Sequence, residues 1–178
     1  SGLGATPPWL ASRQAALSVP GQGGAVAPRL RADQAPRLPE RRLTANGAAA
    51  VEDTLRARSG RSWPETTDFR ESAALLRRAM LIPKVAHLSL ESRRWMVRSQ
   101  LRPDGRDFRR TVSRVVDQPV LGISGAEDTF IRPETVRASA RWARDFHAEL
   151  DPGAGHYPAM ESPAATSRLI VDFARRAG

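Results

Sequence analysis

Residues 119–128, with the sequence PVLGISGAED, combine an apolar strand with a turn that carries two carboxylates. The run 119–124 is short, apolar and bounded by proline and glycine, which is typical of a strand buried on both faces of a parallel sheet. Glu127 and Asp128 follow directly after this run and its turn. Ligands and catalytic groups gather at the carboxyl ends of the strands in such sheets, so the turn is a candidate site.

A helix and a second strand are predicted to follow the turn. Pro133 suits the first position of a helix, which we expect to run to about Asp145. Phe146, Ala148 and Leu150 then alternate with polar residues, as in a strand with one buried face. Strand, helix and strand in this order form the repeating unit of a parallel sheet.

A second loop, residues 151–163 with the sequence DPGAGHYPAMESP, places His156 just before the last predicted helix. Ser162 is the expected N-cap of that helix and Pro163 its first residue. The apolar positions expected to line it are Leu169, Ile170 and Phe173. These elements together predict a parallel α/β unit over residues 116–178.

Asp128 and His156 are expected to lie together, because each follows the carboxyl end of a parallel strand. Asp128 can then accept the ring N–H of His156, which fixes the tautomer of the imidazole and stabilises its charged form. An oxygen of Asp128 should lie roughly 2.6–3.2 Å from a ring nitrogen of His156. Glu127 is the alternative acid.

The remaining histidines, His87 and His147, are expected to be structural or surface residues. His147 stands between Asp145 and Glu149, but no second cluster supports these three side chains, so no metal site is predicted. The chain has no cysteine, which excludes disulfides, zinc–thiolate sites and a cysteine nucleophile. No cofactor is expected.

The net charge of +9 raises the question of nucleic acid. The basic residues are almost all arginines and are scattered, and no nucleic-acid-binding signature is found. We expect solvated helix faces and no nucleic-acid partner, with a phosphate-binding surface as the open alternative.

No apolar run approaches the ~20 residues of a membrane helix, so a soluble, cytoplasmic protein without membrane contact is expected.

Residues 44–100 show the periodicity of three helices. The expected caps are Thr44 or Asn46 for the first helix and Thr67 or Asp68 for the second. The third helix should run from Val85 to about Leu101. The apolar faces are expected at Ala50, Val51 and Leu55, then Phe69, Ala73, Leu76 and Met80, then Val85, Leu88, Ser92 and Trp95. Before these helices, a helical piece at 9–15 and a strand-like piece at 16–19 are followed by an irregular linker at 28–42.

The segment 116–178 resembles the carboxyl-terminal part of the α/β-hydrolase fold. PVLGISGAED resembles the acid strand and turn of that family, and GAGHYPAMESP (residues 153–163) its histidine loop. The 28 residues between Asp128 and His156 suit one crossover helix and one strand. The resemblance implies that Asp128 and His156 are catalytic.

The middle of the chain resembles the helical cap of epoxide hydrolases and haloalkane dehalogenases. The stretches RLPERRLTANG (37–47) and WMVRSQLRPDGRDF (95–108) carry this resemblance. It implies a substrate pocket to which Trp95 and Tyr157 contribute. Epoxide hydrolases carry proton-donating cap tyrosines, but this chain has Ser92 and Arg93 at the corresponding place and Tyr157 as its single tyrosine.

The opening, SGLGATPPWLASR, resembles the end of the nucleophile turn of the fold and the helix after it. The nucleophile position falls on Gly2, which has no nucleophilic side chain, or on Ser1 if the register slips by one. The expected organisation is a remnant of the hydrolase core at 1–27, a helical cap at 28–115 and the carboxyl-terminal core at 116–178. Most of the amino-terminal core, including the nucleophile turn, is expected to be missing.

The predicted fold class is therefore α/β, as part of an α/β-hydrolase with a helical cap. The resemblance implies a hydrolase of a small apolar substrate of the epoxide, ester or haloalkane type, in which Asp128 and His156 activate water. The alternative is a catalytically incompetent remnant that binds at most a small molecule or a partner. We also expect marginal stability and self-association through an open strand edge and the exposed side chains Leu76, Met80, Leu88 and Trp95.

Overall fold

Two parallel strands, β1 (Val120–Gly125) and β2 (Phe146–Asp151), form the sheet of the α/β unit. The computed structural model describes residues 32–99 and 102–177. The register pairs Val120 with Phe146 and Gly125 with Asp151, so both strands end at the same edge. The positions of the predicted strands are confirmed, with the first one shifted by one residue. Their predicted burial is wrong, since β1 is only partly buried up to Ile123 and Ala148 and Leu150 of β2 are exposed.

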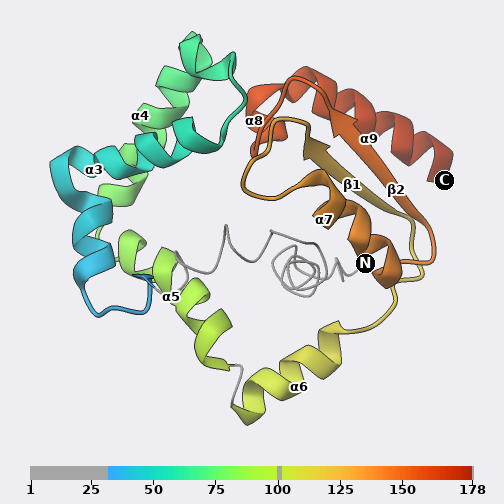
Figure 1. Ribbon diagram of the computed structural model, residues 1–178, viewed down its shortest axis with the longest axis horizontal. Helices are drawn as coiled ribbons and strands as arrows, with labels where there is room; N and C mark the ends of the chain where they lie inside the picture. The colour runs from blue at the N-terminus through green and yellow to red at the C-terminus, as the bar shows by residue number, and fades with distance from the viewer. Residues whose placement is uncertain (1–31, 100–101, 178) are drawn as a thin grey trace.

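The helices of the α/β unit follow the two strands in alternation (Figure 1). The helix expected from Pro133 to Asp145 is instead a short α-helix, α7 (Pro133–Arg137), followed by a 3-10 helix, η3 (Ala138–Trp142). After β2 come the one-turn helix α8 (Pro158–Glu161), which the sequence did not indicate, and the last helix, α9 (Pro163–Ala177). The chain order β1–α7–β2–α9 alternates strands and helices, as in a parallel α/β unit.

Four α-helices and one 3-10 helix lie between residues 32 and 112 in the described part of the chain, and we call them the helical layer. They are α3 (Leu38–Arg58), η1 (Trp63–Glu65), α4 (Thr67–Leu81), α5 (Val85–Arg98) and α6 (Pro103–Val112). In Figure 1 the C-terminal end of α3, η1 and the start of α4 lie next to α8, whereas α6 leads back to β1. The helical layer therefore meets the α/β unit near the loop that carries His156.

The first predicted helix begins earlier than expected, because α3 starts at Leu38 within the segment predicted as a linker. The backbone leaves helical geometry from Ala45 to Ala48, at the place where Thr44 or Asn46 was expected to cap a helix. Asn46, Gly47 and Ala48 all have positive φ there. The capping residues in the sequence thus mark a kink within α3.

Two further details of the helical layer differ from the sequence prediction. The cap of α4 is Thr66, whose side-chain oxygen accepts a hydrogen bond from the Phe69 N–H at 3.1 Å. The sequence prediction placed this cap at Thr67 or Asp68, which lie inside the first turn. Helix α6 was not predicted, since its sequence PDGRDFRRTV is charged and contains a glycine.

The buried face of α5 is also different from the predicted one. Ala86, Leu90 and Arg94 are buried, whereas Leu88 is 63% exposed. Of the four side chains expected to be exposed at an open core, Leu88 is exposed, but Leu76, Met80 and Trp95 are partly buried. The prediction is wrong for α5 because a buried arginine takes a position that periodicity assigns to the polar face.

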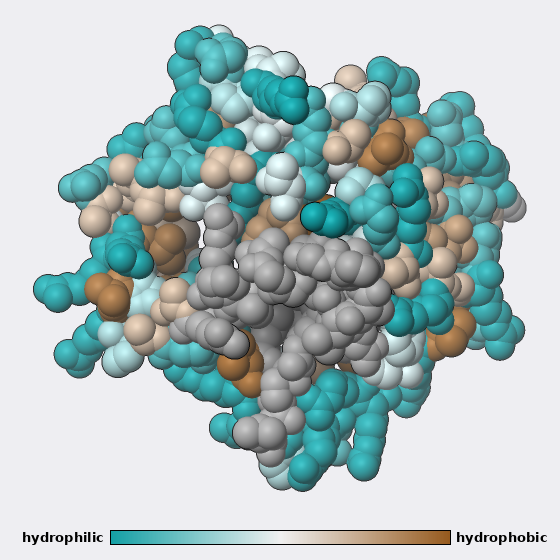
Figure 2. All heavy atoms as spheres, in the orientation of Figure 1, coloured by the Kyte–Doolittle hydropathy of each residue, from teal (hydrophilic) through white to brown (hydrophobic). Residues whose placement is uncertain are grey.

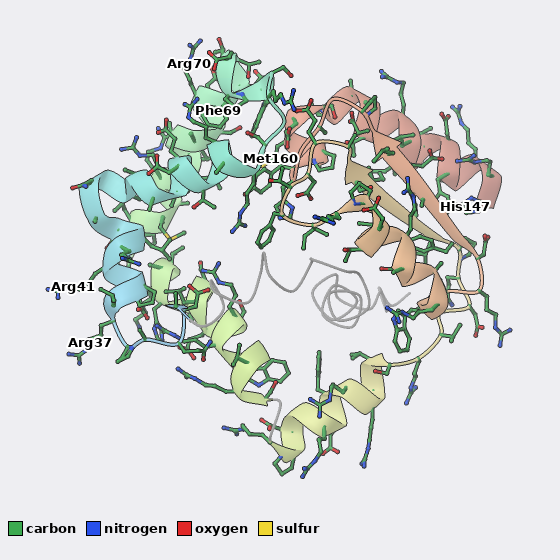
Figure 3. The ribbon with its side chains drawn as sticks, viewed as in Figure 1. Arg37, Arg41, Phe69, Arg70, His147 and Met160 are labelled. Atoms are coloured by element: carbon green, nitrogen blue, oxygen red, sulfur yellow. The ribbon has the colours of Figure 1, made fainter. Side chains whose placement is uncertain are left out.

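A hydrophobic core joins the helical layer to the α/β unit. Leu55, Trp63, Phe69 and Ala73 form its buried part, and the Trp63 and Phe69 rings meet edge to face with centroids 5.1 Å apart. The partly buried side chains packed against it are Leu76, Tyr157 and Met160. Figure 3 shows Met160 extending from α8 toward the C-terminal end of α3. Tyr157 directly follows His156, so this core supports the candidate site.

The surface is mostly hydrophilic on the face drawn in Figure 2, and the hydrophobic residues there form small, separate groups. Exposed apolar side chains do occur, among them Leu75, Leu88, Leu150 and Ile170. No helix among the described residues is long and apolar enough to cross a membrane.

Candidate functional site

Asp128 and His156 form a hydrogen-bonded pair at the carboxyl edge of the sheet. The distance between His156 Nδ1 and Asp128 Oδ2 is 2.9 Å, within the range expected from the sequence. The Asp128 side chain is 6% exposed and that of His156 is 24% exposed. Because a carboxylate only accepts hydrogen bonds, Nδ1 must donate, and a neutral His156 then has its lone pair on Nε2.

The Asp128 carboxylate is held in place by its own turn. Its second oxygen, Oδ1, accepts hydrogen bonds from the N–H groups of Phe130 at 2.7 Å and Ile131 at 2.8 Å. The acid turn (residues 125–128) is bound to residues 151–157, to which the name histidine loop refers from here on. Two backbone bonds make this contact, Ala126 N–H to Asp151 O and Glu127 N–H to Ala154 O. These bonds fix the acid and the histidine relative to each other before any ligand binds.

Aromatic side chains surround the imidazole of His156. The rings of Phe130 and Tyr157 meet it edge to face, with centroids 5.1 Å and 4.9 Å away. The Arg58 guanidinium lies over the Phe130 ring at 3.9 Å. Burial raises the pKa of the Tyr157 phenol, while the charge of Arg58 and its hydrogen bond oppose the rise. Tyr157 is therefore a neutral hydroxyl beside His156 at physiological pH.

The structure places the other predicted residues as follows. Trp95 lies on α5 and its ring packs edge to face on Phe108 of α6, with centroids 5.0 Å apart. In Figure 1 that part of the helical layer is distant from α8 and the histidine loop. Glu127, the alternative acid, accepts the Arg61 N–H at 2.7 Å instead of contacting His156. The candidates Ser1 and Gly2 lie outside the described residues.

The remaining histidines take surface positions, as expected. His87 is 56% exposed beside Glu40, and His147 is 42% exposed and pairs with Asp145 at 2.9 Å. No group of side chains suited to holding a metal ion occurs within residues 32–99 and 102–177.

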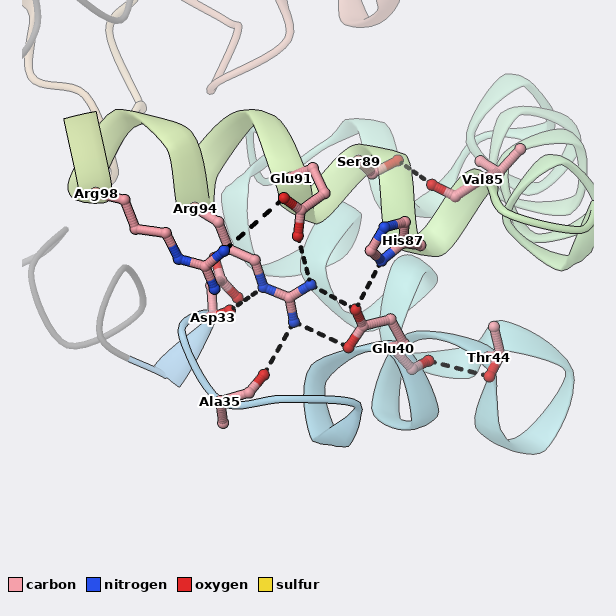
Figure 4. Close-up of polar contacts among 10 residues, drawn as sticks. All are labelled: Asp33, Ala35, Glu40, Thr44, Val85, His87, Ser89, Glu91, Arg94 and Arg98. Atoms are coloured by element: carbon pink, nitrogen blue, oxygen red, sulfur yellow. Dashed lines mark hydrogen bonds and ion pairs between the residues drawn. The ribbon is translucent and has the colours of Figure 1, made fainter. Parts of the chain in front are cut away.

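A second polar cluster, shown in Figure 4, surrounds Arg94 of α5. This guanidinium contacts both oxygens of Glu40, at 2.6 and 3.0 Å, and Glu91 at 3.0 Å. It also donates to the carbonyl oxygens of Asp33 and Ala35. The expectation that the arginines lie on solvated helix faces is wrong for Arg94, since its side chain is 4% exposed.

A cavity of about 510 Å³ lies beside this cluster, lined by Arg37, Glu40, Arg41 and His87. Figure 3 shows Arg37 and Arg41 at the start of α3, away from Met160 and the histidine loop. The cavity is therefore separate from the Asp128–His156 pair, and the cluster beside it joins the start of α3 to α5.

Glu40 should make the stability of the fold sensitive to acid. Hydrogen bonds from Arg94 lower the pKa of Glu40 from 4.5 to about 2, against the opposing effect of burial. A folded-state pKa below the unfolded one stabilises the fold above pH 4.5, and this contribution is lost as the pH falls toward 2. Glu40→Gln should therefore flatten the dependence of unfolding free energy on pH between those values.

Urea unfolding at a series of pH values measures this effect. Glu71→Gln, on the exposed side of α4, is the matched control and should keep the wild-type pH dependence. If the unfolding free energy of Glu40→Gln fell with pH as steeply as that of the wild type, the Arg94–Glu40 pair would not form in solution.

Comparison with known proteins agrees with the fold described above. No family model and no curated protein gives a significant match to the chain. Among solved structures, wild-type Cfl2 from Burkholderia cenocepacia matches with a TM-score of 0.64 at 16% identity, over 87% of this chain and 49% of its own. A thermophilic esterase from Thermogutta terrifontis, solved with malate bound, matches with a TM-score of 0.58 at 23% identity, over 84% and 51% of the two chains.

A serine hydrolase involved in carbazole degradation, the CarC enzyme, matches with a TM-score of 0.50 at 16% identity, over 71% of this chain and 46% of its own. The chain thus spans about half the length of the solved structures that it matches. The parallel strands with their helices and the matched solved structures support the same conclusion. The chain has the fold of part of an α/β-hydrolase.

Proposed function

We propose that this chain supplies the acid and the histidine of a hydrolase that acts on a small apolar substrate. The observation that carries the proposal is the 2.9 Å bond between a buried Asp128 and a partly exposed His156. In this arrangement Asp128 holds the proton on Nδ1 and leaves Nε2 free to accept another. His156 is the general base and Asp128 orients it.

The chemistry at Nε2 is the activation of water on a covalent intermediate. A nucleophile of the complete enzyme first forms an ester with the substrate, as the bond to the leaving group breaks and the alcohol of an ester substrate, or the halide of a haloalkane, departs. His156 Nε2 then removes a proton from water while the water oxygen attacks the ester carbonyl. The tetrahedral species collapses, the nucleophile leaves with its bonding electrons, and the proton on Nε2 passes to the departing group. Asp128 stabilises the imidazolium formed between these two proton transfers.

The nucleophile is proposed to come from a segment outside these 178 residues. The fold places it in a G-x-nucleophile-x-G turn, and no two glycines of this sequence stand four residues apart. Within the part of the chain that the structure describes, the ring of His156 has no side-chain hydrogen bond besides that to Asp128. Ser1 is the alternative nucleophile. We also retain the division into 1–27, 28–115 and 116–178 as a proposal.

Esters are the favoured substrate class, ahead of haloalkanes and epoxides. Two of the matched structures are named as an esterase and a serine hydrolase. Epoxide opening is less favoured, because the positions of the expected cap tyrosines hold Ser92, which donates to the Ser89 carbonyl, and Arg93, which pairs with Asp33 at 3.0 Å. Phe130 and Tyr157 provide an apolar wall, and Trp95 remains a proposed contributor from the helical layer.

The proposal is tested by reading the DNA upstream for an in-frame H-G-x-P loop and nucleophile turn, and by assaying both proteins. The extended protein should hydrolyse p-nitrophenyl butyrate faster than 1-bromobutane or styrene oxide, and His156→Gln should abolish the reaction. The 178-residue chain alone should show little turnover, because it lacks the nucleophile and the oxyanion donors. His147→Gln is the control histidine variant and should keep full activity.

Two outcomes would overturn the proposal. The first is the absence of any such segment upstream, which would favour the alternative function, a chain that binds a small molecule or a partner without catalysis. The second is robust turnover by the 178-residue chain that survives His156→Gln. Turnover by this chain that is lost in Ser1→Ala would instead identify Ser1 as the nucleophile.

A further inference from the structure

Three consecutive backbone N–H groups at His156 have partners outside the histidine loop. Gly155 N–H donates to Glu161 Oε2 at 2.8 Å and Tyr157 N–H to Glu161 Oε1 at 2.9 Å. The N–H of His156 itself donates to the Arg58 carbonyl at 2.8 Å. The backbone position of His156 therefore depends on one carboxylate, Glu161 in α8, and on one carbonyl at the end of α3.

The same carboxylate also binds the helical layer. Glu161 Oε2 accepts the N–H of Gly60 at 2.6 Å, in addition to that of Gly155. Gly60 belongs to residues 58–61, which begin at the last residue of α3 and which we call the docking segment. At its end, Arg61 N–H donates to Glu127 of the acid turn at 2.7 Å. The docking segment thus contacts both loops that carry the candidate catalytic pair.

Close backbone packing is a second, independent sign of this junction. A Cβ atom placed on Gly155 would lie 2.4 Å from Gly60 N and 2.5 Å from the Arg58 carbonyl oxygen. A Cβ on Gly60 would lie 2.6 Å from the Gly153 carbonyl oxygen. A Cβ on Gly125 of the acid turn would meet the carbonyl oxygens of Gly155 and Ala154 even more closely. The docking segment, the histidine loop and the acid turn are therefore in backbone contact.

An ordinary helix cap explains only part of what Glu161 does. Tyr157 is the N-cap residue of α8, and a side chain of the first turn that reaches back to the N-cap N–H is a known capping arrangement. That role accounts for the bond to Tyr157. The bonds to Gly155 and Gly60 lie outside α8. Through them Glu161 joins the histidine loop to Gly60, which is 101 positions away from Glu161 in the sequence.

We propose that Glu161 is a positioning residue, which couples the docking segment of the helical layer to the orientation of His156. The inference rests on the proposed function, because it gives His156 the role of the base. A movement of the helical layer at residues 58–61 then changes how well His156 meets Asp128. The helical layer regulates the catalytic pair through this carboxylate.

Glu161→Gln tests the coupling in the 178-residue chain. The glutamine has nearly the same shape, but its NH₂ group cannot accept the N–H donors that Glu161 Oε1 or Oε2 binds. Because Gly60 and Gly155 share one oxygen, the glutamine should keep its carbonyl there and turn its NH₂ group toward Tyr157. Amide hydrogen exchange at Tyr157 should then become about tenfold faster, as expected for the loss of one hydrogen bond to a charged group, and exchange at Gly60 and Gly155 should also rise, because a neutral acceptor replaces a charged one. The Nδ1–H signal of His156 in proton–nitrogen NMR should shift or broaden, which a simple loss of stability would not cause.

Glu149→Gln is the matched control, since Glu149 lies on β2, away from the docking segment, and pairs with Arg176 at 3.5 Å. It should leave both readouts unchanged. If Glu161→Gln does not fold, Glu161→Asp keeps the charge but shortens the side chain, and the same changes should appear. Unchanged His156 signals in the folded variant would overturn the coupling.

Failure of the coupling can be separated from failure of the proposed function. Asp128→Asn tests the acid–histidine pair with Glu161 intact, and Glu161→Gln tests the junction with Asp128 intact. An altered His156 signal in the first variant only would retain the proposed function and remove the positioning role of Glu161.

Discussion

Asp128→Asn is expected to lower the turnover of the extended hydrolase by about 10⁴-fold, as in serine hydrolases that lose the acid of their triad. Asp128 Oδ1 accepts two backbone N–H groups, from Phe130 and Ile131. The asparagine must therefore place its carbonyl oxygen there and turn its NH₂ group toward His156. Nδ1 then has to accept a hydrogen bond, and the proton moves to Nε2, where the base is needed.

The measurement is kcat for p-nitrophenyl butyrate hydrolysis at neutral pH. Asp145→Asn is a closely matched control, because Asp145 also pairs with a histidine, His147, at 2.9 Å, but on the surface. The control should keep wild-type turnover. A decrease of less than tenfold in Asp128→Asn would remove Asp128 from the mechanism.

Gly155→Ala is expected to destabilise the fold by about 3 kcal/mol, the upper end of the range for overpacked positions. The added methyl group would meet the Gly60 nitrogen at 2.4 Å and the Arg58 carbonyl oxygen at 2.5 Å. Both are backbone atoms that cannot rotate away, so the docking segment must move off the histidine loop. The melting temperature should fall by ~6–12 °C.

Thermal melting of the 178-residue chain measures this effect, with Gly153→Ala as the control two residues away. The nearest atom to a Cβ on Gly153 is Asp151 Oδ1 at 4.0 Å, so that variant should melt like the wild type. Equal melting temperatures for the two alanine variants would mean that the close backbone contact is absent in solution.

The sequence predicted the α/β unit and its site because the relevant signals are local. An apolar strand that ends in a glycine turn predicts where a side chain after it will lie, and this applied to Asp128 and to His156. The two residues are 28 positions apart, but each position depends only on its own strand end. The bond between them follows from the parallel order of the two strands.

Other features could not be predicted because they depend on distant partners. The burial of Arg94 requires Glu40, which is 54 residues away, and no periodicity in α5 distinguishes this arginine from Arg93. Glu161 presents the same difficulty, since its partner Gly60 lies 101 residues away. Helix α6 has a charged sequence and is stabilised by a tertiary contact, the packing of Phe108 on Trp95.

The central claim, that Asp128 holds the proton of His156 on Nδ1, is tested most directly by proton–nitrogen NMR of the histidine rings in the 178-residue chain. At a pH where the ring is neutral, His156 should show a protonated Nδ1 and an unprotonated Nε2, and Asp128→Asn should exchange the two. A wild-type His156 that carries its proton on Nε2, or a tautomer unaffected by Asp128→Asn, would contradict the account.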